Sequence, residues 1–262
     1  MAEPATRAAE WLLGLTSAVY LEYDGGSGRD TLPPEHALAL AQEDGPFFVG
    51  GAFEMLPEFV RPIDELAEAF RAGGGVPQAS FDPRIWEGME RFTAGWFENY
   101  LVPEWIPAMP DVEATLRAGG TLADIGCGGG RAVIKLAQAL PDARFVGYDA
   151  LPGQVERARE NVALAGLADR VRIEQLDGAA GLPETYDVVT TFDVVHDAVD
   201  PRGLLKSIHG SLGPNGIYVM LEINTADDPH DNVGPIATMF YGASIFYCMT
   251  TSLAHGGEGL GT

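Results

Sequence analysis

Residues 121–131 read Thr-Leu-Ala-Asp-Ile-Gly-Cys-Gly-Gly-Gly-Arg, a short apolar stretch that runs directly into a glycine loop. The spaced glycines are Gly126, Gly128 and Gly130, and Asp124 stands two positions before the first of them. Apolar side chains then recur at helical spacing, at Val133, Leu136, Ala137 and Leu140. This pattern predicts a strand, a tight turn and a helix N-terminus. Together they form a cradle in which the glycines let the backbone approach a nucleotide-like ligand.

Two residues of this stretch discriminate between nucleotide ligands. A dinucleotide-binding loop has a third glycine where this chain has Arg131. The Asp124 carboxylate would also repel a pyrophosphate. It suits a cationic ligand without phosphate, such as the ammonium and sulfonium groups of S-adenosylmethionine. A nicotinamide-dependent oxidoreductase on the same architecture is therefore the disfavoured alternative.

The motif acid-x-Gly-x-Gly-x-Gly, here Asp124 to Gly130, resembles the first motif of the class I S-adenosylmethionine-dependent methyltransferases at every fixed position. The resemblance implies S-adenosylmethionine as cofactor and an α/β fold, a Rossmann-like doubly wound, mostly parallel sheet. The whole chain, including Gly73–Pro77, resembles a bacterial group of these enzymes with an N-terminal winged-helix domain. In that group the wing commonly serves packing and dimerisation rather than DNA binding.

Charge and cysteine content limit the partners. Lys and Arg total 16 against 38 Asp and Glu, a net charge of −22, which repels phosphate backbones and argues against a nucleic-acid partner. Cys127 and Cys248 are too few for a disulfide framework, and no signal peptide is evident, so we expect a cytoplasmic protein. Residues 232–254 lack charge over a length that could span a bilayer. They have no basic anchor, so no membrane association is expected.

Residues 121–223 alternate strands with helices, which indicates a parallel sheet covered on both faces. Helices are expected near 130–140, 152–165 and 201–212, and Pro214-Asn215-Gly216 should form the turn into the last strand. The expected strands are Leu122–Ile125, Arg144–Tyr148, Val171–Leu176, Asp187–Phe192 and Ile217–Ile223. Ligands of such sheets bind at the carboxyl ends of the strands.

Four segments follow from this pattern. Residues 1–45 resemble part of a winged-helix domain, with a helix over 4–18 and a strand pair at Val19–Tyr23 and Asp30–Leu32. Residues 46–118 form an aromatic helical cap, 119–223 the cofactor-binding domain, and 224–262 a helical segment on the substrate side. The resembling fold continues with a helix and two more strands, which 224–262 do not supply. We therefore expect a chain truncated at both ends.

Acidic residues close the predicted strands. Asp149 follows Gly126 by 23 residues, where an acid accepts both ribose hydroxyls of a bound adenosine, and Leu151 would then pack near the adenine. The resemblance places Asp177, with Gly178, against the adenine amino group. Each acid has a structural alternative: Asp149 as a solvated turn residue, and Asp177 as part of an ordinary Asp-Gly turn.

The acceptor side should lie after the fourth strand. Phe192 and Asp193 are expected to line the pocket of the cofactor's methionine part. His196, beside Asp197, is the candidate general base, with helix capping or loop support as the alternative. Glu222 and Tyr241 are candidate substrate-side residues. No cluster with metal-ligand spacing is found, so no metal is expected.

The sequence thus predicts an S-adenosylmethionine-dependent methyltransferase acting on a small molecule, with a homodimer formed through the N-terminal region. One alternative is a ligand-sensing winged-helix transcription regulator. It is disfavoured because Arg7 is the only basic residue in the first helix. The other alternative is an inactive methyltransferase fragment.

Overall fold

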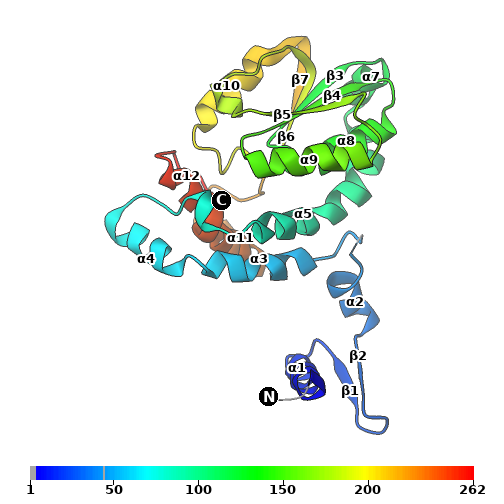
Figure 1. Cartoon of the computed structure of the whole chain (residues 1–262), viewed down its shortest axis with the longest axis vertical. Coiled ribbons are helices and arrows are strands. Elements are labelled where there is room, and N and C mark those ends of the chain that lie inside the picture. The colour runs from blue at the N-terminus through cyan, green and yellow to red at the C-terminus, as the bar shows by residue number, and fades with distance from the viewer. Residues whose placement is uncertain (1–3, 44) are drawn as a thin grey trace.

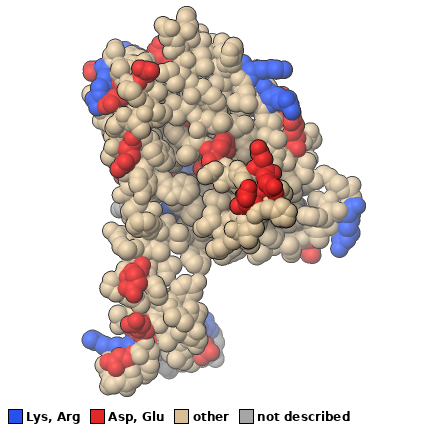
Figure 2. All heavy atoms as spheres, turned by 180° about the vertical axis from the view of Figure 1, so that it is seen from behind, with Lys and Arg blue, Asp and Glu red and all other residues tan. Residues whose placement is uncertain are grey.

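A computed structural model describes residues 4–43 and 45–262. Figure 1 shows three parts: an α/β body, a layer of helices below it, and an N-terminal arm that extends away from both. Acidic side chains are scattered over the face seen in Figure 2, along the arm as well as the body.

The body is a five-stranded sheet in the order β5-β4-β3-β6-β7, with every neighbouring pair parallel. This confirms the predicted fold class. The strands are β3 (Thr121–Ile125), β4 (Arg144–Asp149), β5 (Val171–Gln175), β6 (Tyr186–Phe192) and β7 (Leu212–Leu221). Among the described residues, β7 is an edge strand that pairs only with β6.

The predicted start of the last strand is wrong. β7 begins at Leu212, which pairs with Tyr186, and the register then jumps so that Ile217 pairs with Val188. The turn expected at residues 214–216 is therefore an irregularity inside the strand, the kind of extra length that a β-bulge accommodates. The strand also ends at Leu221, so Glu222 lies just beyond it, at the edge where ligands bind.

Alternation along the strands builds one core on each face of the sheet. Leu122 and Phe145 point to the face covered by α7 (Pro110–Arg117), α8 (Arg131–Ala139) and α9 (Pro152–Leu164). Ala123 and Val146 point to the other face, covered by α10 (Pro201–Ser211). The three helices predicted within residues 121–223 are thus present.

The helical layer combines two distant parts of the chain. It contains α3 (Gly50–Val60), α4 (Ile63–Ala72), α5 (Arg84–Trp96), the π-helix η2 (Phe97–Trp105), α6 (Ile106–Ala108), α11 (Pro235–Ala243), the π-helix η5 (Ser244–Cys248) and α12 (Met249–Ala254). Phe59, Val76 and Ile85 share one apolar core with Tyr247. The Val76 amide donates to Thr250 Oγ1 at 2.9 Å. We call this layer the cap. It is helical, as expected for 46–118, and includes the helix from the segment after 223.

The arm contains α1 (Pro4–Ser17), the hairpin β1 (Glu22–Asp24) and β2 (Arg29–Thr31), and α2 (Pro34–Leu40). The hairpin begins later than predicted because Val19, at φ 64°, lies in the turn after α1. That the arm is part of a winged-helix domain stays a prediction, as does the division of the chain into four segments.

One continuous helix among the described residues, Pro235–Ala254, is long and apolar enough to cross a bilayer by length and composition. Here it packs in the cap through Tyr247 and Thr250, both buried. The expected lack of membrane association stays a prediction.

Candidate cofactor and acceptor site

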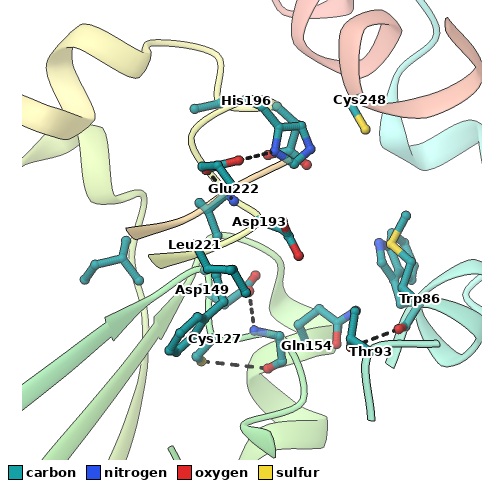
Figure 3. Close-up of a pocket in the computed structure, with 18 of the residues that line it drawn as sticks. Trp86, Thr93, Cys127, Asp149, Gln154, Asp193, His196, Leu221, Glu222 and Cys248 are labelled. Atoms are coloured by element: carbon teal, nitrogen blue, oxygen red, sulfur yellow. Dashed lines mark hydrogen bonds and ion pairs between the residues drawn. The ribbon is translucent and has the colours of Figure 1, made fainter. Parts of the chain in front are cut away.

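A cavity of about 1050 Å³ lies between the carboxyl ends of the strands and the cap. Figure 3 shows its two ends: Asp149, Cys127 and Gln154 at the glycine loop, and Asp193, His196, Glu222 and Cys248 at the other. The glycine loop and the His196–Glu222 pair therefore line one and the same cavity.

The glycine loop adopts the conformation that the motif predicts. Gly126 and Gly128 have φ of 71° and 51°, in the left-handed region that favours glycine. A Cβ at Gly126 would lie 2.6 Å from Val194 Cγ2, so a side chain there would collide with the loop after β6. Gly130 (φ 80°) precedes α8 and packs against Ala158 instead of lining the cavity. Contact of Gly130 with the cofactor stays a prediction.

Asp124 and Asp149 are the two buried acids at this end. Burial raises the pKa of Asp124 to about 7, although Thr190 Oγ1 donates to its carboxylate at 2.7 Å. Burial also raises the pKa of Asp149, whose two oxygens accept from the amides of Gly128 and Leu151, each at 2.9 Å. A cationic or hydrogen-donating ligand strongly stabilises the ionised form of a buried carboxylate, because the low-dielectric surroundings solvate its charge poorly.

Asp177 lies in the turn that the sequence offered as the structural alternative. Its carboxylate accepts from the Ala179 amide at 3.0 Å and so caps the short 3₁₀ helix Gly178–Ala180. Asp177, Gly178 and Leu151 also line the cavity. Contact with an adenine stays a proposal for all three.

The acceptor end is organised by Glu222. Its Oε1 accepts from the amides of Val194 (3.1 Å) and Val195 (2.6 Å), and its Oε2 lies 2.6 Å from His196 Nδ1. The hydrogen bond with His196 lowers the pKa of Glu222 against the opposing effect of burial. An ionised carboxylate can only accept, so Nδ1 of His196 carries the proton and Nε2 is the ring nitrogen left to act on other groups.

Asp193 has φ 56°, an uncommon backbone conformation for a residue with a side chain. Figure 3 shows its carboxylate directed into the cavity. Burial raises its pKa to about 6. Phe192, the residue before it, also lines the cavity. That both residues contact the methionine part of a cofactor stays a prediction.

Several charged and polar groups surround His196. Burial opposes protonation of the imidazole, but hydrogen bonds with Cys248 and Glu222 and the nearby Asp197 charge raise its pKa to about 11. The sequence suggested the adjacent Asp197 as its partner, whereas the carboxylate that binds the ring is Glu222. That pairing spans 26 residues, and no local pattern reveals it.

The ligand atoms of Asp193, His196 and Glu222 lie within 4.8 Å of one another, a set that could hold a metal ion. Sequence spacing did not reveal this group because its members come from two strand ends. The His196–Glu222 hydrogen bond satisfies two of the three without a metal. The expectation of no metal stays a prediction.

The rest of the acceptor wall is aromatic. Trp86 Nε1 donates to the Tyr247 hydroxyl at 2.9 Å and joins α5 to η5 across the cavity. Tyr241 is not among the residues that line the cavity: it is 39% exposed, and its hydroxyl accepts from Asn232. Its substrate-side role stays a prediction. The wall comprises Phe59, Trp86, Phe92, Trp96, Phe97, Tyr100, Trp105, Phe192, Phe240 and Tyr247.

Arg131, which replaces the third glycine of a dinucleotide loop, connects the cap to the body. Its guanidinium lies 3.5 Å from Glu90 and 3.9 Å from Glu98, and Glu90 also pairs with Arg157 at 2.8 Å. The cap helices α5 and η2 are thus held over the glycine loop by charge. The sequence showed that Arg131 departs from the dinucleotide pattern but gave no sign of this role.

Comparison with known proteins agrees with this geometry. A family model described as a methyltransferase domain matches residues 123–218. Residues 123–218 are therefore similar to a methyltransferase domain. Curated relatives of this domain include the ubiquinone biosynthesis O-methyltransferase of Ruegeria pomeroyi, 36% identical over 107 residues, which are 41% of this chain and 42% of that protein. The Pseudomonas syringae pv. tomato enzyme of the same name is 30% identical over 142 residues, covering 54% and 58%. The matched part of the chain therefore spans between 42% and 58% of these two relatives.

Solved structures extend the likeness beyond the methyltransferase domain. "PigF with SAH" covers 95% of this chain and 74% of its own, with a TM-score of 0.70 and 20% identity. An O-methyltransferase family protein from Burkholderia thailandensis covers 94% and 73%, with a TM-score of 0.65 and 20% identity. These likenesses confirm the class I methyltransferase fold over nearly the whole described chain.

Proposed function

We propose that this chain binds S-adenosylmethionine at the glycine loop and transfers its methyl group to a small-molecule acceptor in the same cavity. The observation that carries the proposal is one cavity with buried Asp124 and Asp149 at one end and the His196–Glu222 pair at the other. The names of the O-methyltransferase relatives support it, as does the solved neighbour described with SAH.

The residues proposed to bind the cofactor have different chemical roles. Asp149 has carboxylate lone pairs for the ribose hydroxyls, while Leu151, Asp177 and Gly178 surround the adenine. Asp124, close to the loop, provides the negative charge for the cationic methionine part. Phe192 and Asp193 lie farther along the cavity, where the sulfonium would face the acceptor.

Methyl transfer is an in-line displacement at the sulfonium methyl carbon, so the chain's main task is to align the two reactants and exclude water. The aromatic wall supplies an apolar, closed environment. A hydroxyl acceptor must also lose a proton, and Nε2 of neutral His196 is the group placed to take it. Glu222 fixes the ring and stabilises the imidazolium that forms.

Calorimetric titration of the full chain with S-adenosylmethionine, S-adenosylhomocysteine and NADH tests the cofactor assignment. Both sulfur compounds should bind. Asp124→Ala and Asp149→Ala should each weaken binding by roughly 1–3 kcal/mol, because a charge-assisted contact is lost. Asp142→Ala removes an exposed acid outside the cavity and is the matched control. Binding of NADH but of neither sulfur compound would refute the proposal, and unchanged affinity in both cavity variants would refute the site.

We further propose that the protein is cytoplasmic, acts without nucleic acid or membrane, and pairs with a second copy through the arm. Trp11, Leu13 and Val19 leave apolar surface exposed there. The acidic arm has only Arg7 and Arg29 as basic residues between positions 4 and 43, too few for a phosphate-binding surface.

A further inference from the structure

The acids that line the cavity are not balanced by basic residues beside them. Among the described residues, no lysine or arginine lines the cavity. Two of the lining acids are nevertheless paired: Glu90 with Arg157 at 2.8 Å, and Glu222 with His196 at 2.6 Å. A third, Asp200, caps the start of α10. These three acids therefore need no charge from a ligand.

Asp193 and Asp197, at the acceptor end, lack such a partner. Figure 3 shows the Asp193 carboxylate directed into the cavity, and one of its oxygens lies within 4.8 Å of a His196 ring nitrogen and a Glu222 oxygen. Asp197 follows His196 in the chain and lines the same cavity. Within the described part of the chain, neither carboxylate accepts a hydrogen bond. Because Glu222 already balances the charge of a protonated His196, the acceptor end retains a negative excess.

The cofactor does not remove this excess. S-adenosylmethionine has one net positive charge, and the two buried acids at the glycine loop, Asp124 and Asp149, already exceed it. Burial raises the pKa of Asp193 to about 6 and that of Asp197 to about 7. Ionised carboxylates in such surroundings are costly unless a positive charge lies near them. A cation on the acceptor would stabilise both.

Aromatic side chains complete this end of the cavity. Trp86 Nε1 donates to the Tyr247 hydroxyl at 2.9 Å, and the rings of Phe92 and Trp96 pack edge to face with centroids 5.2 Å apart. All four residues line the cavity. Aromatic faces stack on flat rings and attract cations, so this wall suits a ligand that has both.

We propose that the methyl acceptor is an aromatic molecule that bears a hydroxyl group and a positively charged nitrogen, and that the cavity disfavours anionic acceptors. This inference rests on the proposed methyl transfer and specifies its substrate class. The ring packs against the aromatic wall, the hydroxyl lies at Nε2 of His196, and the nitrogen lies near Asp193 and Asp197.

The reaction balances with this acceptor. The hydroxyl proton moves to Nε2 of neutral His196, and the oxygen forms a bond to the methyl carbon. The bond from that carbon to sulfur breaks, and S-adenosylhomocysteine leaves with the bonding electrons. The charged nitrogen keeps its proton near the carboxylates, so it has no lone pair with which to compete for the methyl group.

Three phenols of similar size test the charge preference: tyramine, with an ammonium group, tyrosol, which is neutral, and 4-hydroxyphenylacetate, which is anionic. Each is titrated calorimetrically into the unaltered full chain, with and without S-adenosylhomocysteine. Tyramine should bind roughly tenfold more tightly than tyrosol, and 4-hydroxyphenylacetate should bind most weakly. Equal affinities, or tightest binding of 4-hydroxyphenylacetate, would overturn the inference.

Substitution of the two unpaired acids locates the preference. Asparagine tolerates the positive φ of Asp193, and it preserves the size of both side chains. The double variant Asp193→Asn with Asp197→Asn should keep the affinity for tyrosol and lose the roughly tenfold preference for tyramine. Asp142→Asn, an exposed acid outside the cavity, should keep the preference. A preference that persists in the folded double variant would contradict the assignment.

S-adenosylmethionine binding is measured on the same protein, so the two proposals can fail separately. If the chain prefers tyramine but binds no S-adenosylmethionine, only the proposed function is refuted. If it binds S-adenosylmethionine but does not distinguish the three phenols, only the substrate class is refuted.

Discussion

Asp124 carries a charge that depends on pH near neutrality, because burial raises its pKa to about 7. A bound cation favours the ionised form and so lowers that pKa. Binding below pH 7 must therefore release a proton, and affinity for S-adenosylmethionine should increase as the pH rises through about 7.

Asp124→Asn should remove this increase and leave a weaker affinity with little dependence on pH in that interval. Titration calorimetry across the interval, in buffers of different ionisation enthalpy, measures both affinity and proton release. A mutant that retains the full pH dependence would assign the effect to another acid, such as Asp193.

His196 is the second residue whose protonation matters. Because its pKa is raised to about 11, the neutral form that can accept a proton becomes more abundant as the pH rises from neutrality. The rate constant for methyl transfer should increase over that interval. His196→Gln can still donate to Glu222 but cannot act as a base, so the rate should fall roughly 10²- to 10⁴-fold and lose its pH dependence.

His209→Gln, an exposed histidine near the end of α10, is the matched control for this measurement. Cofactor affinity should be similar in all three proteins. If His196→Gln lowers the rate but keeps the pH profile of the unaltered chain, His196 supports the loop rather than accepting the proton.

At the level of elements, α3 and α5 approach closely where Gly51 faces Gly88. A Cβ at Gly51 would overlap the Gly88 carbonyl and the Phe92 amide. Gly51→Ala should therefore lower the free energy of unfolding by roughly 1–3 kcal/mol, by the usual cost of overpacking. Gly210→Ala, in α10 with open space around it, should be neutral or stabilising. Chemical denaturation of both variants checks this, and equal stabilities would contradict the assigned packing.

Local signals predicted the elements that depend on neighbouring residues. The strand-loop-helix of 121–139 was predictable because its glycines, Asp124 and the apolar spacing all lie within one short segment. Pairings between distant segments were not predictable. Glu222 contacts His196 only because β6 and β7 end side by side. Tyr247 contacts Trp86 only because η5 packs near α5 in the cap. The bulge in β7 was missed because Pro214–Gly216 has the composition of an ordinary turn.

At the scale of the whole molecule, the arm is the part least involved in the cavity. Trp11 is 64% exposed on α1, in a chain whose large negative charge would otherwise keep copies apart. If a second copy covers this surface, Trp11→Glu should shift the protein from dimer toward monomer. Light scattering after size-exclusion chromatography measures the mass.

Phe70→Glu, an equally exposed apolar residue on α4 in the cap, should leave the dimer intact. A monomeric unaltered chain would rule out the dimer. If the dimer persists in Trp11→Glu but is lost in Phe70→Glu, the dimer interface lies on the cap instead of the arm.

The bonds from Val76 to Thr250 and from Trp86 to Tyr247 join positions more than 160 residues apart. A ribosome synthesises the glycine loop and most of the sheet long before it reaches Tyr247, so the body can begin to fold while the cap lacks one of its helices. Closing so long a loop is entropically costly and slow. The cofactor end of the cavity should therefore form early during synthesis, and the acceptor end should form only once the last helix has emerged.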